Sequence, residues 1–223
     1  MPKIKLIIFD IDNVLFDTGY FENRENVAAS TWGVIYSRLN AEKEDEKLKE
    51  KWSSGGHKNY IEWQNDALNV FKNYGLTKEI FFDIINSLPI MDGAKETIDE
   101  LKRKDILTAT ISGSFFELAA RTRKLGIDFP FASCSLIFDH DKLVDWVTLP
   151  FDYEGKANFF NALISTLKIK PEECAFVCDG VNDINLAKNV GMPIAFNARD
   201  ELKKHCKIIV DKKDLREILK YLE

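Results

Sequence analysis

Apolar and polar positions along this chain of 223 residues follow two different periods. The run Leu6-Ile7-Ile8-Phe9 is continuously apolar and is bounded by charge, which is typical of a strand buried on both faces. From Asp92 onward, short apolar runs take turns with stretches in which apolar residues recur at helical spacing. This order predicts repeated βα units, a mostly parallel sheet and right-handed crossovers.

The individual elements after residue 92 can be placed from the same pattern, and a small hairpin is expected between Leu136 and Val147, with Asp139-His140-Asp141 at its tip. Strands are expected at Ile106 to Ile111, Ala175 to Cys178, Pro193 to Phe196 and Ile208 to Val210, and helices at Ala94 to Leu101, Phe115 to Leu125, Phe159 to Leu167, Ile184 to Val190 and Leu215 to Leu222.

The stretch from Tyr20 to Ser87 has helical periodicity without a convincing strand, so it is interpreted as an insertion after the first strand. Mixed charge from Ala41 to Lys51 is typical of a solvated helix face. The Gly/Ser cluster at residues 53–57 ends that helix and is either a plain connector or a mobile edge over a pocket. We therefore predict a catalytic core from residues 1–16 and 89–223, and a helical cap domain from residues 17–88.

Composition excludes several classes of protein. Hydrophobic residues make up 45% and charged residues 30%, which excludes a mainly disordered chain. A net charge of -5 argues against nucleic acid as the main partner. No apolar stretch approaches membrane-spanning length and no signal-peptide pattern is present, so no membrane partner and a cytoplasmic location are expected. The oligomeric state stays open.

The four cysteines do not form a metal or disulfide pattern. They lack a CxxC pair and have no neighbouring histidine at zinc spacing, so we expect reduced thiols in the core. The residues are Cys134, Cys174, Cys178 and Cys206.

Asp10 and Asp12 stand where the first strand ends. Side chains at i and i+2 share one side of a strand, so both carboxylates can face one small space at the carboxyl edge of the sheet, where open α/β sheets bind ligands. An acidic pair can also be plain solvated surface. Three further polar groups are expected at the same edge, at Ser112-Gly113, Gly155-Lys156 and the run from Asp179 to Asp183. Each could separately be a cap, a solvated lysine or a turn, but their shared placement favours one site.

The acidic residues of this site are expected to need a nearby positive charge. Asp10, Asp12, Asp179 and Asp183 would converge, and two like charges about 4 Å apart repel by about 4 kcal/mol at an effective dielectric constant of about 20. Without a cation, some of these carboxylates should take up protons. Because the ligands are hard oxygens, Mg²⁺ is the expected cofactor.

Four motifs together resemble those of the haloacid dehalogenase superfamily of phosphatases. They are DIDNV at residues 10–14, SGS at residues 112–114, Lys156, and DGVND at residues 179–183. Within the superfamily, the segments around Gly113 and Lys156 and at residues 179–186 and 191–198 are most similar to phosphoserine phosphatases. The resemblance covers nearly all of the non-inserted chain. It implies a doubly wound α/β fold, a Rossmann-like parallel sheet with a helical cap inserted after the first strand.

The resemblance also implies roles for residues. Asp10 is expected to be the nucleophile that forms an aspartyl phosphate, and Asp12 the general acid and base, with a pKa raised by its acidic neighbours. Lys156, the Ser112 hydroxyl and the Gly113 amide at a helix start are expected to hold the phosphoryl oxygens.

The remaining implied roles concern the metal and the substrate. Asp179 is expected to bind Mg²⁺ together with Asp10 and the backbone carbonyl of Asp12, Asp183 to support the metal shell, and Asn182 to contact phosphate or substrate. The expected activity is Mg²⁺-dependent hydrolysis of a small phosphorylated metabolite. Phosphoryl transfer to an alcohol acceptor and a non-catalytic binding protein on the same fold are the alternatives.

The chain departs from the phosphoserine phosphatase pattern at the residues with which those enzymes bind the serine part of the substrate. A glutamate past the first aspartates and a cap arginine are expected there, but Gly19 stands at the glutamate position and the region of Asn65-Asp66-Ala67 offers no arginine. Glu22 and Arg24 could substitute by a different geometry or simply begin a helix.

Aromatic residues of the insertion add a further hypothesis. Trp32, Trp52 and Trp63 could line an apolar pocket, although aromatics at helical positions usually belong to a core. His57 could reach the active site from the Gly/Ser cluster.

Overall fold

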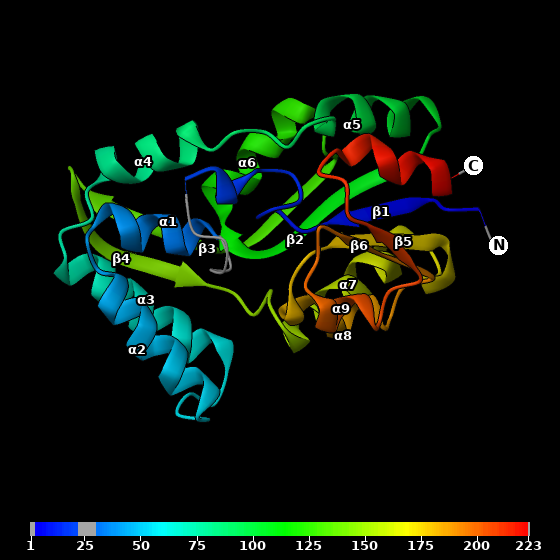
Figure 1. Cartoon of the computed structure of the whole chain (residues 1–223). Coiled ribbons are helices and arrows are strands. Elements are labelled where there is room, and N and C mark those ends of the chain that lie inside the picture. Colours follow the sequence, from blue (N-terminus) through cyan, green and yellow to red (C-terminus); the bar gives the residue numbers. More distant parts are fainter. Residues whose placement is uncertain (1–2, 22–29, 223) are drawn as a thin grey trace.

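The computed structural model describes residues 3–21 and 30–222, so Glu22 and Arg24 lie outside the described residues. Its centre is a seven-stranded sheet in the order β4-β3-β2-β1-β5-β6-β7 (Figure 1). Six strands are parallel, and β4 alone runs antiparallel, beside β3. The strands are β1 (Leu6–Phe9), β2 (Leu107–Phe115), β3 (Phe129–Asp139), β4 (Lys142–Thr148), β5 (Cys174–Cys178), β6 (Met192–Phe196) and β7 (Ile208–Val210).

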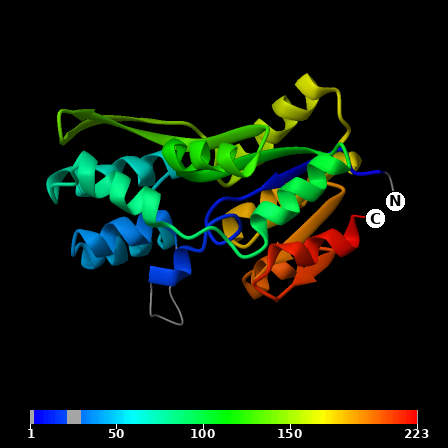
Figure 2. The same cartoon turned by 90° about the horizontal axis from the view of Figure 1, so that it is seen from above.

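Helices cover both faces of the parallel part of the sheet (Figures 1 and 2). Side chains of β1 alternate between the two faces, since Ile7 and Phe9 pack in one hydrophobic cluster and Leu6 and Ile8 in the other. This arrangement confirms the predicted doubly wound α/β fold. One face carries α5 (Ala94–Arg103), α6 (Phe116–Leu125) and the 3-10 helix η4 (Leu215–Tyr221), and the other carries α7 (Glu154–Leu167), α8 (Ile184–Ala187) and α9 (Asp200–Lys203).

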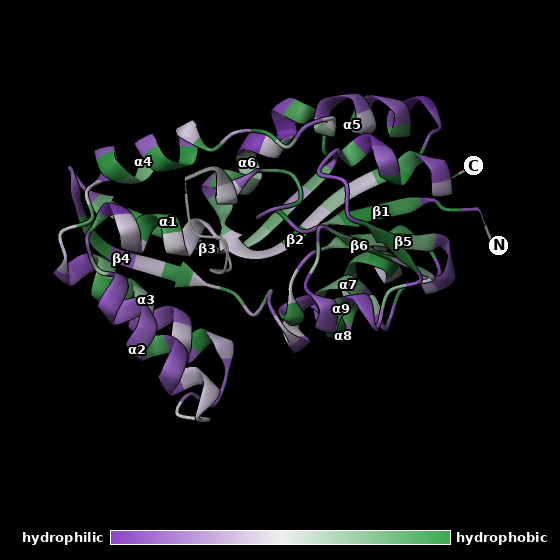
Figure 3. Ribbon diagram, viewed as in Figure 1, coloured by the Kyte–Doolittle hydropathy of each residue, from purple (hydrophilic) through white to green (hydrophobic). Residues whose placement is uncertain are grey.

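Among the described residues, four α-helices lie between β1 and the rest of the core in sequence, as the predicted helical insertion requires. Ser30, Asn59 and Thr77 each accept a backbone hydrogen bond as N-caps, which fixes where α1, α3 and α4 begin. Only Asp45 is buried along α2, which is the solvated helix that the mixed charge predicted, and Figure 3 shows it as largely hydrophilic. The four are α1 (Thr31–Arg38), α2 (Glu42–Ser53), α3 (Tyr60–Asn73) and α4 (Lys78–Ser87).

The predicted hairpin is present as β3 and β4, joined at His140-Asp141, and it packs against the inserted helices. Trp146 Nε1 donates a hydrogen bond to Asn65 Oδ1 on α3 at 2.7 Å, and Lys72 Nζ donates to the Val144 carbonyl at 2.7 Å. The helical insertion is therefore attached to the core both by its chain connections and by this hairpin. The exact domain limits at residues 17 and 88 stay a prediction.

Some element boundaries differ from the prediction. Strand β2 continues to Phe115 because residues 112–115 still pair with β3, through a register shift between Ser112 and Phe115. Gly113 therefore lies within a strand, and the predicted placement of its amide at a helix start is wrong. The helix expected at Ile184 to Val190 ends at Ala187, and the last helix is a 3-10 helix.

All four cysteines are free and wholly or partly buried, as expected from their spacing. In the part of the chain that the structure describes, each helix is too short or too polar to cross a lipid bilayer.

Candidate active site

The chemistry-bearing residues that the sequence singled out meet at one end of the sheet. Strand β1 is paired in parallel with β2 on one side and β5 on the other, so the residues that follow these strands are spatial neighbours. Asp10 follows β1, Ser112 lies near the end of β2, and Asp179 follows β5. They line a cavity of about 590 Å³ that also receives side chains from α2 and α3 of the helical insertion.

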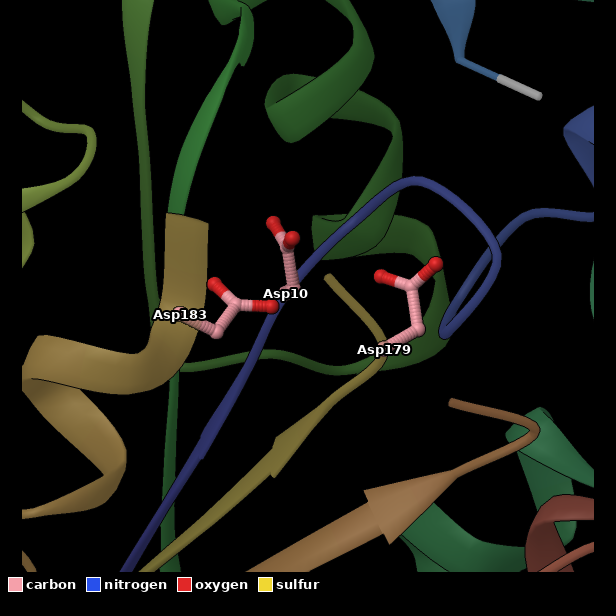
Figure 4. Close-up of side chains that lie close together, drawn as sticks. All are labelled: Asp10, Asp179 and Asp183. Carbon is pink, nitrogen blue, oxygen red and sulfur yellow. The ribbon is translucent and has the colours of Figure 1, made fainter. Parts of the chain in front are cut away.

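Three carboxylates form a cluster beside this cavity, of which Asp10 and Asp179 line it and the fully buried Asp183 does not. Asp10, Asp179 and Asp183 each offer an oxygen atom, and the three oxygens lie within 4.8 Å of one another (Figure 4). Asp10 and Asp183 are buried and Asp179 is partly buried. The hard oxygen donors, their burial and their mutual repulsion fit a divalent cation such as Mg²⁺.

The charge state of the cluster reflects its crowding. Burial raises the pKa of Asp179 well above its usual value, and the charges on Asp10 and Asp183 raise it further. Burial likewise raises the pKa of Asp183, against the opposing influence of Lys156. The expectation that these carboxylates would resist simultaneous ionisation without a cation therefore agrees with their surroundings.

Lys156 supplies a buried positive charge beside the cluster. It lies in the first turn of α7, its side chain is fully buried, and its Nζ is 3.1 Å from Asp10 Oδ2 and 3.6 Å from Asp152 Oδ1. It also forms an ion pair and a hydrogen bond with Asp183. Burial alone would lower the pKa of Lys156, but Asp10, Asp183 and Asp152 together raise it well above its usual value. The ammonium is therefore held charged beside the Asp10 carboxylate, although Lys156 is not itself among the residues that line the cavity.

Asp12 lines the cavity but its carboxylate lies outside the three-carboxylate cluster. It accepts hydrogen bonds from the Thr31 amide at 3.0 Å and from Thr31 Oγ1 at 2.5 Å, at the start of α1. Burial raises the pKa of Asp12 to about 6, the bonds from Thr31 oppose the rise, and the charge on Asp10 adds to it. From the sequence, acidic neighbours were predicted to raise this pKa; the charge on Asp10 does so, but burial is the larger cause. A carboxyl group of this kind can give up or take a proton near neutral pH.

The segment Ser112-Gly113 is fixed by contacts from several elements. The Ser112 hydroxyl accepts a hydrogen bond from the Ser114 amide at 3.2 Å. The Gly113 carbonyl accepts from Ser133 Oγ at 2.9 Å and from Trp32 Nε1 at 3.2 Å, so a strand of the core and a helix of the insertion both hold this peptide. A Cβ atom at Gly113 would overlap the Asp152 carboxylate, which explains the glycine.

Asp152 was not predicted from the sequence. It is buried, lines the cavity, and accepts a hydrogen bond from Asn182 Nδ2 at 2.8 Å, so it links two of the groups predicted to bind phosphate, Asn182 and Lys156. Burial raises its pKa, and Lys156 and Asn182 oppose the rise. The only signal in the sequence was its position four residues before Lys156.

Asn13 was also missed, although it lies within the first motif. Its Nδ2 donates a hydrogen bond to Asp179 Oδ2 at 3.2 Å, and its Oδ1 accepts from Thr18 Oγ1 at 2.7 Å. Its φ of 58° is in the left-handed region, which asparagine tolerates better than most residues, and this conformation turns the chain directly after Asp12. The amide therefore orients one member of the carboxylate cluster.

The aromatic residues proposed from the insertion do reach the cavity. Trp32, Trp52 and Trp63 all line it, and Trp32 is at the same time packed into the core. His57 is not among the lining residues, because its Nε2 lies 3.0 Å from Asp66 Oδ2 within the insertion. Asn65, in the segment where a cap arginine was expected, binds Trp146 of the hairpin and does not line the cavity.

Comparison with known proteins agrees with this geometry. A sequence model of haloacid dehalogenase-like hydrolases matches residues 4–191. The phosphoserine phosphatase of Methanocaldococcus jannaschii is 30% identical over 222 residues, which covers 99% of each chain, and that of Wolinella succinogenes is 29% identical over 98% of this chain and 100% of the relative. A substrate-bound phosphoserine phosphatase complex and a phospho-aspartyl intermediate analogue of phosphoserine phosphatase are both 30% identical, each with a TM-score of 0.81. The first covers 100% of both chains, and the second covers 99% of this chain and 100% of the other. The chain therefore belongs to the haloacid dehalogenase-like hydrolase family, as an enzyme of the phosphatase type.

Proposed function

We propose that this enzyme hydrolyses a phosphomonoester of a small metabolite, with Mg²⁺ as cofactor and an aspartyl phosphate on Asp10 as intermediate. The observation that carries the proposal is the charged, buried Lys156 beside the cluster of Asp10, Asp179 and Asp183. Two members of that cluster, Asp10 and Asp179, line a cavity large enough for a small metabolite. The relatives named phosphoserine phosphatase and the neighbouring structure of a phospho-aspartyl intermediate analogue support it. A cytoplasmic location stays a prediction from the sequence.

The carboxylates of Asp10 and Asp179 and the backbone carbonyl of Asp12 would hold the metal ion, with Asp183 supporting it. When bound, Mg²⁺ neutralises negative charge on the phosphoryl group and on the carboxylates around it. Lys156 adds a second positive charge beside Asp10. With the Ser112 hydroxyl, the Gly113 amide and the Asn182 amide, Lys156 holds the phosphoryl oxygens in place.

The covalent steps then fall to the two aspartates. An Asp10 carboxylate oxygen forms a bond to phosphorus while the ester P–O bond breaks, and the departing alkoxide takes the proton of Asp12. Asp12, now a carboxylate, removes a proton from a water molecule whose oxygen bonds to phosphorus, while the bond between phosphorus and the Asp10 oxygen breaks. Inorganic phosphate leaves and both aspartates return to their starting states. The raised pKa of Asp12 suits this exchange of a proton in both directions.

The proposal is tested by measuring phosphate release from a panel of phosphomonoesters, including phosphoserine and a generic aryl phosphate. We expect release with Mg²⁺, its loss with EDTA, and its return when Mg²⁺ is added in excess. Added alcohols in the same reaction report any transfer, because a new phosphate ester would then appear among the products. Absence of Mg²⁺-dependent release from every ester, or a transfer product in place of free phosphate, would contradict the proposal.

A further inference from the structure

We propose that the organic group of the substrate is apolar and contains a flat ring, and that an aromatic wall of four side chains recognises it. The aromatic wall consists of Trp52, Tyr60, Trp63 and Tyr153, all of which line the cavity. This inference rests on the proposed function and names the class of substrate for the same site.

The four rings of the aromatic wall support one another. Tyr60 and Trp63 are stacked with ring centroids 5.1 Å apart and an interplanar angle of 16°, and Trp52 contacts Tyr153 at 5.1 Å. Tyr60 joins the two pairs, with its centroid 5.5 Å from that of Tyr153. Because each ring is held by another ring, the wall is pre-organised, and a ligand that packs on it loses little side-chain entropy.

The aromatic wall joins the two parts of the molecule. Trp52 is on α2, Tyr60 and Trp63 are on α3, and Tyr153 directly precedes α7 of the core. All four side chains are partly exposed, in contrast to Trp32 next to them, which is 5% exposed. Rings that are packed together yet leave area open to a cavity are available for a ligand.

The aromatic wall stands beside the groups proposed to hold phosphate. Tyr153 is adjacent in sequence to Asp152, whose carboxylate binds Asn182. At the other end, Trp63 contacts Trp32 at a centroid distance of 5.2 Å, and Trp32 Nε1 donates to the Gly113 carbonyl. The organic group attached to a phosphoryl group at this site therefore lies against aromatic carbon.

The charged residues of the cavity do not offer an equivalent site for a polar head group. Glu46, Lys49 and Arg199 line the cavity but are exposed to water, so they belong to its outer part. Lys49 is also paired with Asp45 at 2.5 Å. A carboxylate placed against the faces of these rings would lose its hydration without a hydrogen-bond donor in return, whereas an apolar ring gains by leaving water.

The test compares 2-phenylethyl phosphate with ethyl phosphate. Both leave as primary alkoxides, so a difference in kcat/KM reports how the ring is bound rather than how easily the bond breaks. We expect kcat/KM for the phenylethyl ester to be at least about tenfold higher in the unchanged enzyme. Trp63→Ala should reduce this ratio about tenfold, and Trp52→Ala should reduce it in the same direction.

The matched control is Tyr74→Ala, which removes an aromatic ring that is 46% exposed, follows α3 and does not line the cavity. It should leave the ratio unchanged. Thermal melting followed by circular dichroism shows whether each variant is folded. If one of the two wall variants fails to fold, the ratio measured for the other wall variant decides the test. Hydrolysis of both esters without a preference for the ring, or a preference that survives both wall variants, would overturn this inference alone. No turnover of either ester, while other esters of the panel are hydrolysed, would also overturn this inference alone, and no turnover of any ester would refute the proposed function as well.

Discussion

Replacing Lys156 with methionine should destabilise the fold by more than an ordinary lysine substitution does. The ammonium lies 3.1 Å from one carboxylate oxygen and 3.6 Å from another, and each such pair has an attraction of about 5 kcal/mol at an effective dielectric constant of about 20. Part of this attraction is offset by the cost of burying the ammonium. Removing one partner of a buried ion pair typically costs about 3–5 kcal/mol, because the remaining charges stay buried without compensation. We expect a loss in this range at pH 8 without metal.

The loss should depend on pH in a defined direction. Burial raises the pKa values of Asp152 and Asp183, and Lys156 opposes the rise, so without the lysine these two carboxylates retain protons more strongly in the folded than in the unfolded state. A folded state that binds more protons becomes less stable as pH rises, so the variant should lose less at pH 5.5 than at pH 8. Mg²⁺ should restore part of the loss at pH 8, since it supplies positive charge to the same carboxylates.

Urea unfolding followed by circular dichroism measures these differences, with EDTA present and then with Mg²⁺. Lys95→Met is the matched control, since Lys95 is about half exposed on α5 and paired with Asp99 at the surface. Its loss should stay below about 1 kcal/mol at either pH. The reasoning is refuted if Lys156→Met costs no more than this control at pH 8, or if its loss grows as the pH falls.

Two further predictions concern single carboxylates. Asp152→Asn keeps an acceptor for Asn182 but removes a negative charge beside the proposed phosphate groups, so inorganic phosphate should inhibit about tenfold more strongly. Unchanged or weaker inhibition, measured as the inhibition constant, would contradict that role. Asp214, hydrogen-bonded to Arg216, has its pKa lowered to about 2, which contributes stability that is complete above about pH 4 and is lost as pH falls toward 2. After allowance for solvent screening, Asp214→Asn should cost about 1 kcal/mol in urea unfolding at pH 7 and clearly less at pH 3, and an equal loss at both would argue against it.

Most of the fold could be predicted because the order of apolar and polar residues in each segment determines whether it forms a strand or a helix. The apolar run of β1 and the alternation of strand and helix after residue 92 are properties of neighbouring residues, and the structure has them where expected. The end of β2 could not be placed, because Ser112-Gly113-Ser114 is polar and small and becomes strand only through its pairing with β3. The packing of the hairpin on α3 is likewise a tertiary contact without a local signal.

Some residues of the candidate site could likewise be predicted from local patterns, and others could not. Asp10, Asp179 and Lys156 could be placed together from sequence because each stands at the end of a strand or the start of a helix, and parallel strands bring those positions to one edge. Asp152 could not, since it follows an antiparallel edge strand through an irregular loop. For Trp52 the sequence left open whether the ring belonged to a core or a cavity, because an aromatic residue at helical spacing is compatible with both.

The central claim is that Asp10 is the group that takes the phosphoryl group from substrate. Its most direct test is turnover of a generic aryl phosphate by Asp10→Asn at saturating Mg²⁺, beside the unchanged enzyme. Asparagine has nearly the same shape and can still accept the hydrogen bond from the Ile11 amide, and Lys156 keeps Asp152 and Asp183 as partners, so the variant should remain folded. The account predicts a folded protein without turnover above the background rate, and turnover within about tenfold of the unchanged enzyme would contradict it.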